Sequence, residues 1–128
     1  MRAGSADLHT HSNRSDGCYS PREVLRRAER VGLGAAAITD HDTVAGLAEA
    51  EEAARELEID FIPGIELSVP WKGQEFHLLG YWIDPGDGGL AGLLREIAGS
   101  REERARAIVN RLHALGIPLR FDAVIAAA

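Results

Sequence analysis

The chain has 128 residues, a length that suits one ordinary domain or a piece of a larger protein. Fourteen basic and twenty acidic residues give a formal net charge of −6, which argues against a protein that coats nucleic acid through a basic surface. The single cysteine, Cys18, excludes an internal disulfide and favours a reducing, cytoplasmic location. No apolar run approaches 18 residues and no signal-peptide pattern opens the chain, so we expect no membrane association.

The first predicted element is a short strand over residues 5–11, followed by a Ser-Asp-Gly turn. His9 and His11 are two residues apart, so on an extended strand both imidazoles point to the same side. Two imidazoles that meet at one point are good ligands for Zn, Mn or Fe. Asp16 in the turn can bring a carboxylate back to the same place. The alternative is that both histidines are polar residues on an exposed edge strand.

A helix is predicted to begin at Pro21, because Ser20 can cap it and Glu23 completes a capping box. Gly32 or Gly34 should end this helix. The apolar run over residues 35–39 is typical of a strand buried in a parallel sheet.

Asp40-His41-Asp42 follows where that buried strand should end. A second helix is expected from a cap at Thr43 to about Leu57, and a third strand over residues 61–66, bent or interrupted at Pro63-Gly64. A fourth strand over residues 75–82 would carry His77. Alternating strands and helices of this kind predict a parallel α/β fold.

From Leu90 onward, leucines and isoleucines recur at helical spacing, with a dense face of Arg and Glu between them. A pause at Gly99-Ser100 can split this segment into two helices, and Gly116 and Pro118 should end it. Asp122 can cap one more helix, but the sequence stops six residues later, which we interpret as a cut.

Six residues stand out as candidate metal ligands because they lie at, just after or, in one case, within predicted strands. They are His9, His11, Asp16, His41, Glu66 and His77. The carboxyl ends of parallel strands share one face of a barrel, so side chains far apart in sequence can converge there. Several imidazoles with two carboxylates suit two or three divalent ions, and a glutamate can bridge them.

Each candidate also has a structural interpretation. Residues 40–42 can be a solvated loop, Glu66 can form a surface ion pair, and His77 can be a hydrogen-bonded core histidine. His113, in the late helical segment, is expected to be structural. Arg14 lies inside the histidine-rich loop, and an arginine fork matches phosphate oxygens; substrate binding and an ordinary surface position are equally good interpretations.

Four motifs in order make the chain resemble the PHP (polymerase and histidinol phosphatase) superfamily. They are Asp-Leu-His-Thr-His-Ser with Ser-Asp-Gly, Ile-Thr-Asp-His-Asp-Thr, Pro-Gly-Ile-Glu, and His-Leu-Leu-Gly. The resemblance covers residues 7 to about 82. It implies an α/β fold, the N-terminal part of a distorted (β/α)7 barrel, with a trinuclear metal site that hydrolyses phosphoesters.

The resemblance also implies a role for each matched residue. One ion would be held by His9, His11 and Glu66, a second by Glu66 and His77, and a third by Asp16 and His41. The ions would be Mn, Fe, Zn or Mg, up to three in a complete protein. Apart from the resemblance, the arginine fork suggests that Arg14 holds a non-bridging phosphate oxygen. We expect Arg14 and Glu66 to be the catalytic residues. Three acidic residues are expected to orient the histidines from a second sphere: Asp7, Asp40 and Asp42.

Within the superfamily the motifs are most similar to the stand-alone bacterial branch. That branch contains 3′,5′-nucleoside bisphosphate phosphatases and a 5′–3′ exoribonuclease that acts on short RNA. Residues 1–88 would form the N-terminal part of the barrel, and residues 89–128 would begin a helical insertion. A mid-chain ligand and a late Asp-x-His pair are absent, so about half of the barrel is missing.

We therefore expect hydrolysis of nucleotides or short RNA by a metal-activated hydroxide, with weak activity in this chain alone. Alternatives are histidinol phosphate hydrolysis, a DNA exonuclease, and a non-catalytic fragment or regulatory metal-binding module. The acidic charge disfavours stable binding to duplex DNA. An incomplete barrel would also leave an unpaired strand edge, which favours self-association.

Overall fold

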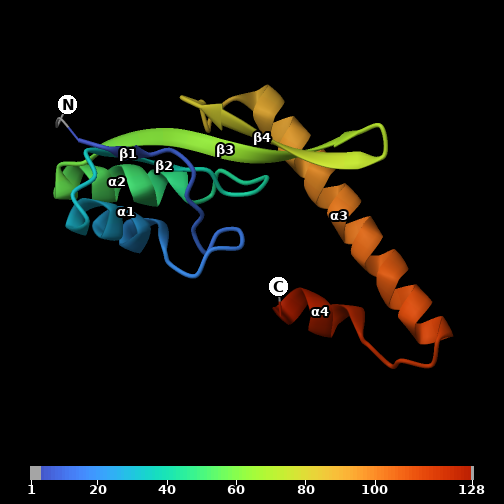
Figure 1. Ribbon diagram of the computed structural model, residues 1–128. Helices are drawn as coiled ribbons and strands as arrows, with labels where there is room; N and C mark the ends of the chain where they lie inside the picture. The colour runs from blue at the N-terminus through green and yellow to red at the C-terminus, as the bar shows by residue number, and fades with distance from the viewer. Residues whose placement is uncertain (1–3, 128) are drawn as a thin grey trace. The chain divides into compact units, whose positions relative to one another are not determined.

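The structure is a computed structural model that describes residues 4–127 (Figure 1). The chain divides into two compact units, Met1–Asp87 and Gly88–Ala128. Among the described residues, no helix combines the length and the apolar character needed to cross a membrane.

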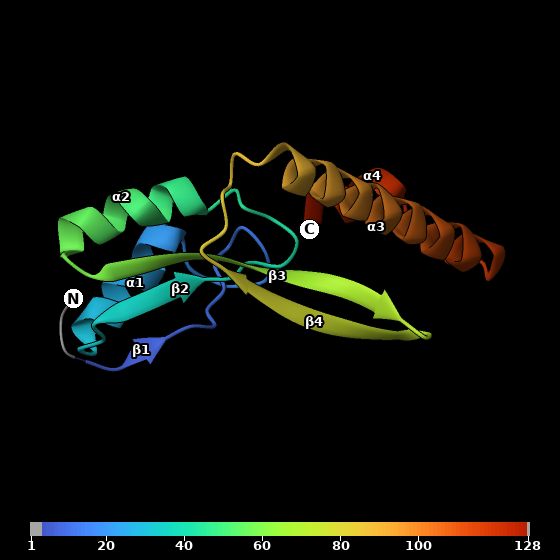
Figure 2. The same cartoon turned by 90° about the horizontal axis from the view of Figure 1, so that it is seen from above.

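The first unit is built on a four-stranded sheet in the order β1-β2-β3-β4 (Figure 2). The strands are β1 (Ala6–Asp7), β2 (Ala35–Ile38), β3 (Asp60–Trp71) and β4 (Gln74–Tyr81). The first three are parallel, and β4 runs antiparallel to β3. The start of β3, residues 60–63, pairs with β2, whereas residues 64–71 pair with β4.

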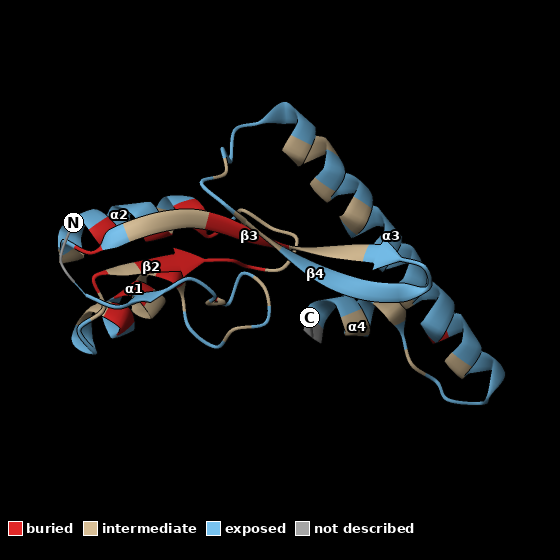
Figure 3. Ribbon diagram, turned by 45° about the horizontal axis from the view of Figure 1, so that its top comes forward, coloured by how far each residue is buried: buried red, intermediate tan, exposed pale blue. Residues whose placement is uncertain are grey.

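Two helices, α1 (Pro21–Arg30) and α2 (Leu47–Leu57), cover one face of this sheet (Figure 2). As the sequence predicted, Pro21 is the first helical residue of α1 and the Ser20 hydroxyl accepts the Glu23 amide. The core lies between the helices and the sheet, where the buried residues of Figure 3 concentrate. Its members are Leu25, Ala28, Ala36, Ile38, Leu47, Ala50, Ala53, Ala54 and Ile59. The small alanines let α2 approach the strands closely.

Three elements of the first unit differ from the prediction. The first strand is only Ala6–Asp7 rather than residues 5–11, so the histidines follow it instead of lying on it. Helix α2 begins at Leu47 rather than near Thr43, because the chain just before Thr43 pairs with β3 through a β-bridge between His41 and Glu66. Strand β3 continues through Pro63-Gly64 without interruption and runs to Trp71, beyond the expected end at residue 66.

The second unit consists of α3 (Gly88–Ala114) and α4 (Phe121–Ala127). The expected break at Gly99-Ser100 is wrong: α3 is continuous there, because an isolated helical glycine costs only about 1 kcal/mol. Gly116 takes a positive φ of 79° after the helix, which agrees with the predicted end. His113 contacts the Leu119 carbonyl, in line with the expected structural role.

Candidate metal centre

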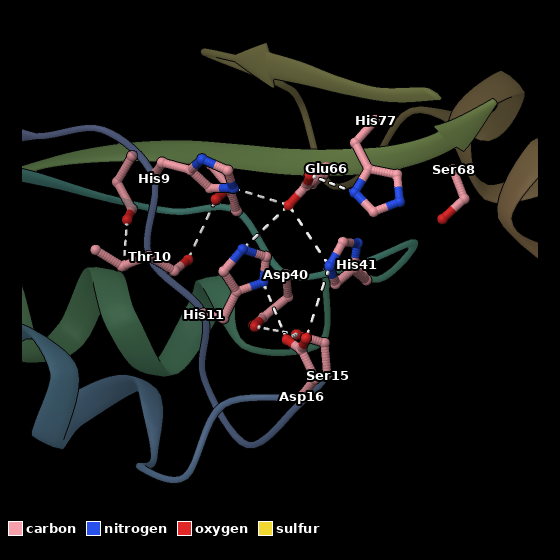
Figure 4. Close-up of polar contacts among 12 residues, drawn as sticks. His9, Thr10, His11, Ser15, Asp16, Asp40, His41, Glu66, Ser68 and His77 are labelled. Carbon is pink, nitrogen blue, oxygen red and sulfur yellow. Dashed lines mark hydrogen bonds and ion pairs between the residues drawn. The ribbon is translucent and has the colours of Figure 1, made fainter. Parts of the chain in front are cut away.

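The candidate site is formed by polar side chains that lie on or just after the first three strands, together with one histidine from β4 (Figure 4). His9 and His11 follow β1, and His41 follows β2. Glu66 lies in the middle of β3, and His77 lies on β4. The convergence expected at the strand ends is therefore present for all four imidazoles and the glutamate.

The Glu66 carboxylate is the centre of this cluster. Its Oε2 atom lies 2.9 Å from His9 Nε2, 3.0 Å from His11 Nε2 and 3.6 Å from His41 Nε2. Its other oxygen, Oε1, lies 2.9 Å from His77 Nδ1. The Glu66 side chain is only 4% exposed, so the surface ion pair considered from the sequence is wrong.

Burial alone would raise the pKa of Glu66. The hydrogen bond with His9 and the nearby charges of His41, His9 and His11 oppose that effect and lower the pKa below its ordinary value. Glu66 is therefore held as a carboxylate, the form in which it can act as a metal ligand.

Backbone pairing explains why His41 lies beside Glu66. The two residues form a parallel bridge that extends the β2–β3 ladder past the end of β2. The Glu66 amide donates to the Asp40 carbonyl at 3.2 Å, and the Asp42 amide donates to the Glu66 carbonyl at 2.9 Å. Residues 40–42 are thus an ordered continuation of the β2–β3 ladder. The alternative of a solvated loop, considered from the sequence, is wrong.

Asp16 reaches the cluster from the loop between β1 and α1. Its Oδ1 atom lies 3.3 Å from His11 Nδ1, and its Oδ2 atom lies 3.7 Å from His41 Nε2. The loop can approach because its next residue is Gly17: a Cβ there would lie 2.3 Å from the His11 carbonyl oxygen. The Asp16 side chain remains 68% exposed, open to a ligand from solvent.

The same loop is anchored by a buried network that the sequence did not reveal. Asp40 Oδ1 accepts the Ser12 amide at 2.6 Å and the Ser15 hydroxyl at 2.8 Å. Asp40 Oδ2 accepts the Ser12 hydroxyl at 2.6 Å. Ser12 is fully buried, and the only sequence signal was its place within the His-x-His-Ser motif.

The remaining acidic candidates contact backbone groups. Asp7 Oδ1 accepts the His9 amide at 3.2 Å, and Asp42 Oδ1 accepts the Ser68 amide at 2.8 Å. Asp7 and Asp40 thus hold the main chain and hydroxyl groups of the segment that carries the histidines, and their role in orienting the imidazoles stays a prediction. Arg14 Nη2 lies 3.0 Å from Glu49 Oε2 on α2, so its half-exposed guanidinium is paired within the fold.

Three overlapping groups of side chains have the spacing of metal ligands. They are His9, His11 and Glu66; His11, Asp16 and His41; and His41, Glu66 and His77. Within each group the ligand atoms lie within 4.8 Å of one another, close to the span of two bonds of about 2.0–2.2 Å to one ion. The mixed imidazole and carboxylate donors suit Zn, Mn or Fe.

The imidazoles themselves support this fit. Ring centroids are 5.1 Å apart for His9 and His11, 4.7 Å for His11 and His41, and 4.8 Å for His41 and His77. The buried Nδ1 atoms of His11 and His41 make no hydrogen bond within residues 4–127, although such atoms normally do; His11 Nδ1 has only the Asp16 carboxylate nearby, at 3.3 Å. The donor set therefore suits divalent cations.

Comparison with known proteins decides the family. The PHP domain matches residues 7–109, which is most of the chain. The chain belongs to the PHP domain family. This membership confirms the resemblance drawn from the four motifs.

Relatives of this PHP chain are named for phosphoester chemistry. It is 42% identical over 122 residues to a 5′-3′ exoribonuclease of Haemophilus influenzae, covering 95% of the chain and 44% of that relative. It is 45% identical over 116 residues to a 3′,5′-nucleoside bisphosphate phosphatase of Chromobacterium violaceum, covering 91% and 41%. The chain thus spans less than half the length of the curated relatives it matches.

A solved structure supports the fold. A protein of Bifidobacterium adolescentis, proposed to be a metal-dependent phosphoesterase, superposes with a TM-score of 0.84 at 32% identity. The superposition covers 98% of this chain and 43% of that one. The predicted class is confirmed: the curled α/β sheet is the N-terminal part of a PHP barrel.

Proposed function

We propose that this chain carries the N-terminal part of the active site of a metal-dependent phosphoesterase that releases phosphate or nucleotides from small nucleotides or short RNA. The observation that carries the proposal is the buried Glu66 carboxylate, which lies within 3.6 Å of ring nitrogens from four histidines. None of these five residues belongs to the hydrophobic core, which lies between the helices and the sheet, so packing of the core does not explain the cluster.

We assign the ligands in three groups. His9, His11 and Glu66 hold one ion, Glu66 and His77 a second, and Asp16 and His41 a third. The spacing supports this assignment and adds His41 to the second group and His11 to the third. Mn, Fe, Zn and Mg all remain candidates, with up to three ions in a complete protein.

When bound, divalent ions supply positive charge that polarises a phosphoester and acidifies water. The protein's part is to hold the donors in place before substrate arrives. Glu66, buried and ionised, presents one oxygen toward His9 and His11 and the other toward His77, which suits a bridging role. Arg14 lies on the loop that carries Asp16 and is the candidate that binds a phosphate oxygen, provided that it leaves Glu49.

The substrate class comes from the relatives. A 3′,5′-nucleoside bisphosphate phosphatase and a 5′-3′ exoribonuclease both act on phosphates of nucleotides. The net charge of −6 also favours a small or short substrate over long duplex DNA. We further assign residues 1–88 to the barrel part and residues 89–128 to the start of a helical insertion. A cytoplasmic location remains a prediction.

The first test removes one proposed ligand. His9→Ala should lower Mn²⁺ binding, measured by equilibrium dialysis and plasma emission, by at least about tenfold, because it removes a donor from the Glu66 group. Phosphate release from a panel of nucleoside bisphosphates and short RNAs should fall with it. His113→Ala is the matched control, since His113 lies on α3 outside the cluster. Full Mn²⁺ binding by His9→Ala, or turnover that survives excess chelator, would contradict the proposal.

A further inference from the structure

A hydrogen bond from the Tyr81 side chain connects the end of β4 with the segment just after β1. In the order β1-β2-β3-β4, β1 and β4 are at opposite edges. The sheet curls, however, and the Tyr81 hydroxyl at the end of β4 donates to the Leu8 carbonyl just after β1, at 2.9 Å. This hydrogen bond spans 73 residues of sequence and lies next to His9.

The segment that carries His9 needs such support. Strand β1 contributes only two residues to the ladder, so residues 8–10 lack regular pairing. Thr10 is fixed by its hydroxyl, which donates to the Ala37 carbonyl at 2.6 Å, and by its own carbonyl, which accepts the Thr39 amide at 2.9 Å. Leu8 is held by Tyr81, the His9 amide donates to Asp7 Oδ1 at 3.2 Å, and the His9 side chain is 50% exposed.

Tyr81 also connects His9 with the opposite side of the cluster. His77 and Tyr81 are four residues apart on β4, so both side chains lie on the same face of that strand. Glu66 lies between the two joined segments, with Oε2 toward His9 and Oε1 toward His77. A tie between Leu8 and β4 therefore limits how far the imidazoles on either side of Glu66 can separate.

We propose that Tyr81 is a positioning residue: its hydroxyl ties the end of β4 to Leu8 and so fixes His9 beside Glu66. The inference rests on the proposed function, because it concerns the same ligand group. Tyr81 contacts neither substrate nor ion in this role. It acts through the main chain of Leu8, and it keeps the His9 imidazole in position before an ion binds.

The test compares two tyrosine variants of the full 128-residue chain. Tyr81→Phe removes only the hydroxyl, and Tyr19→Phe is the matched control, because it removes the hydroxyl from a tyrosine whose ring stacks under Arg27 instead of bonding Leu8. Amide hydrogen exchange, followed residue by residue by NMR without metal, should be about threefold to tenfold faster at His9 in Tyr81→Phe, the effect of one ordinary hydrogen bond. Exchange at Ile65 should be unchanged, and Tyr19→Phe should match the wild type at both amides.

Calorimetric titration with Mn²⁺ is the second measurement. Tyr81→Phe should weaken the binding step that His9→Ala removes by about the same factor, threefold to tenfold, because only the preorganisation of one ligand is lost. Unchanged exchange at His9 would overturn the inference. Equal acceleration at His9 and Ile65 would also overturn it, since that result describes general loosening. If the wild type bound no Mn²⁺, the proposed function would fail, while the exchange data would still decide whether Tyr81 holds the His9 segment.

Discussion

At the scale of single residues, the position of Asp16 depends on the absence of a side chain next to it. Gly17 packs so closely that a Cβ would lie 2.3 Å from the His11 carbonyl oxygen and 2.8 Å from that of Ser12. The Gly17 amide also donates to the Ser12 carbonyl at 2.9 Å, which closes the loop. Backbone atoms cannot move aside as a flexible side chain can, so any larger residue must displace the loop and Asp16 with it.

Gly17→Ala should therefore impair the site although alanine carries no charge. We expect a loss of about 1–3 kcal/mol in unfolding free energy, the usual cost of overpacking. We also expect one ion fewer per chain, because Asp16 moves away from His11 and His41. Urea denaturation and metal analysis would measure the two effects. Gly99→Ala on α3, where a Cβ meets open space, is the control and should be neutral or slightly stabilising. A Gly17→Ala protein with wild-type stability and metal content would refute this account.

At the scale of elements, the sequence predicts those helix and strand boundaries that depend on neighbouring residues. The Ser20-Pro21-Glu23 pattern located the start of α1, because capping involves only neighbouring residues. The start of α2 was missed because residues 41–42 pair with Glu66 across the sheet, a contact no local pattern encodes. The histidine pair is visible in the sequence, but the hydrogen bond from the Ser12 hydroxyl to Asp40 is not, because the two residues are 28 apart in the chain. Tertiary contacts of this kind decide which polar residues are ligands and which are supports.

Strand β3 illustrates the same limit. Pro63-Gly64 suggested an interruption, yet Pro63 lies where β3 changes its partner from β2 to β4, and the Pro63 carbonyl accepts the Ile83 amide at 3.3 Å. Gly64 is required by close approach, since a Cβ would lie 2.8 Å from Thr39 Cγ2 on the neighbouring chain segment. The glycine thus marks tight packing of β3 beside the end of β2, not the end of a strand, and this packing places Glu66 beside His41.

Glu49 links the site loop to both helices, and its titration makes the link testable. Its carboxylate accepts Arg14 Nη2 at 3.0 Å and the Arg22 amide at 3.3 Å. Burial alone would raise the pKa of Glu49, but Arg14 and the Arg22 amide outweigh burial and lower it below the ordinary value of 4.5. Because the folded pKa is depressed, this contribution to stability is present above pH 4.5 and is lost as the pH falls through the folded pKa.

Glu49→Gln should accordingly lower the unfolding free energy by about 0.5–1 kcal/mol at pH 7, and by less as the pH falls below the ordinary carboxyl pKa. Urea titrations at a series of pH values would measure the difference from the wild type. Glu51→Gln on the same helix is the control, because Glu51 pairs with Arg55 at an exposed i,i+4 position. A difference for Glu49→Gln that grows toward low pH would have the wrong sign for this mechanism.

At the scale of the whole molecule, the cluster of proposed ligands around Glu66 is in place, but large apolar side chains nearby are exposed. The chain matches 41–44% of the length of its curated relatives. Within the first unit, Trp71, Phe76 and Leu78 on the β3–β4 hairpin are exposed, and Trp82 is 73% exposed. The β1 edge also has no further strand among the described residues. Large apolar side chains and a free edge of this kind promote association.

The 128-residue chain should therefore self-associate and work poorly compared with a full-length relative. Each proposed ion has only three ligand atoms from this chain, so we expect fewer than three ions per chain and rapid metal exchange. Phosphate release should be far below that of the Chromobacterium violaceum relative assayed in parallel with Mn²⁺, because loosely held ions do not keep the phosphoester polarised. Size-exclusion chromatography with light scattering and plasma emission analysis would measure association and metal content. A monomer with three tightly bound ions and a turnover of about 1–1,000 per second would show that the cluster needs nothing beyond these residues.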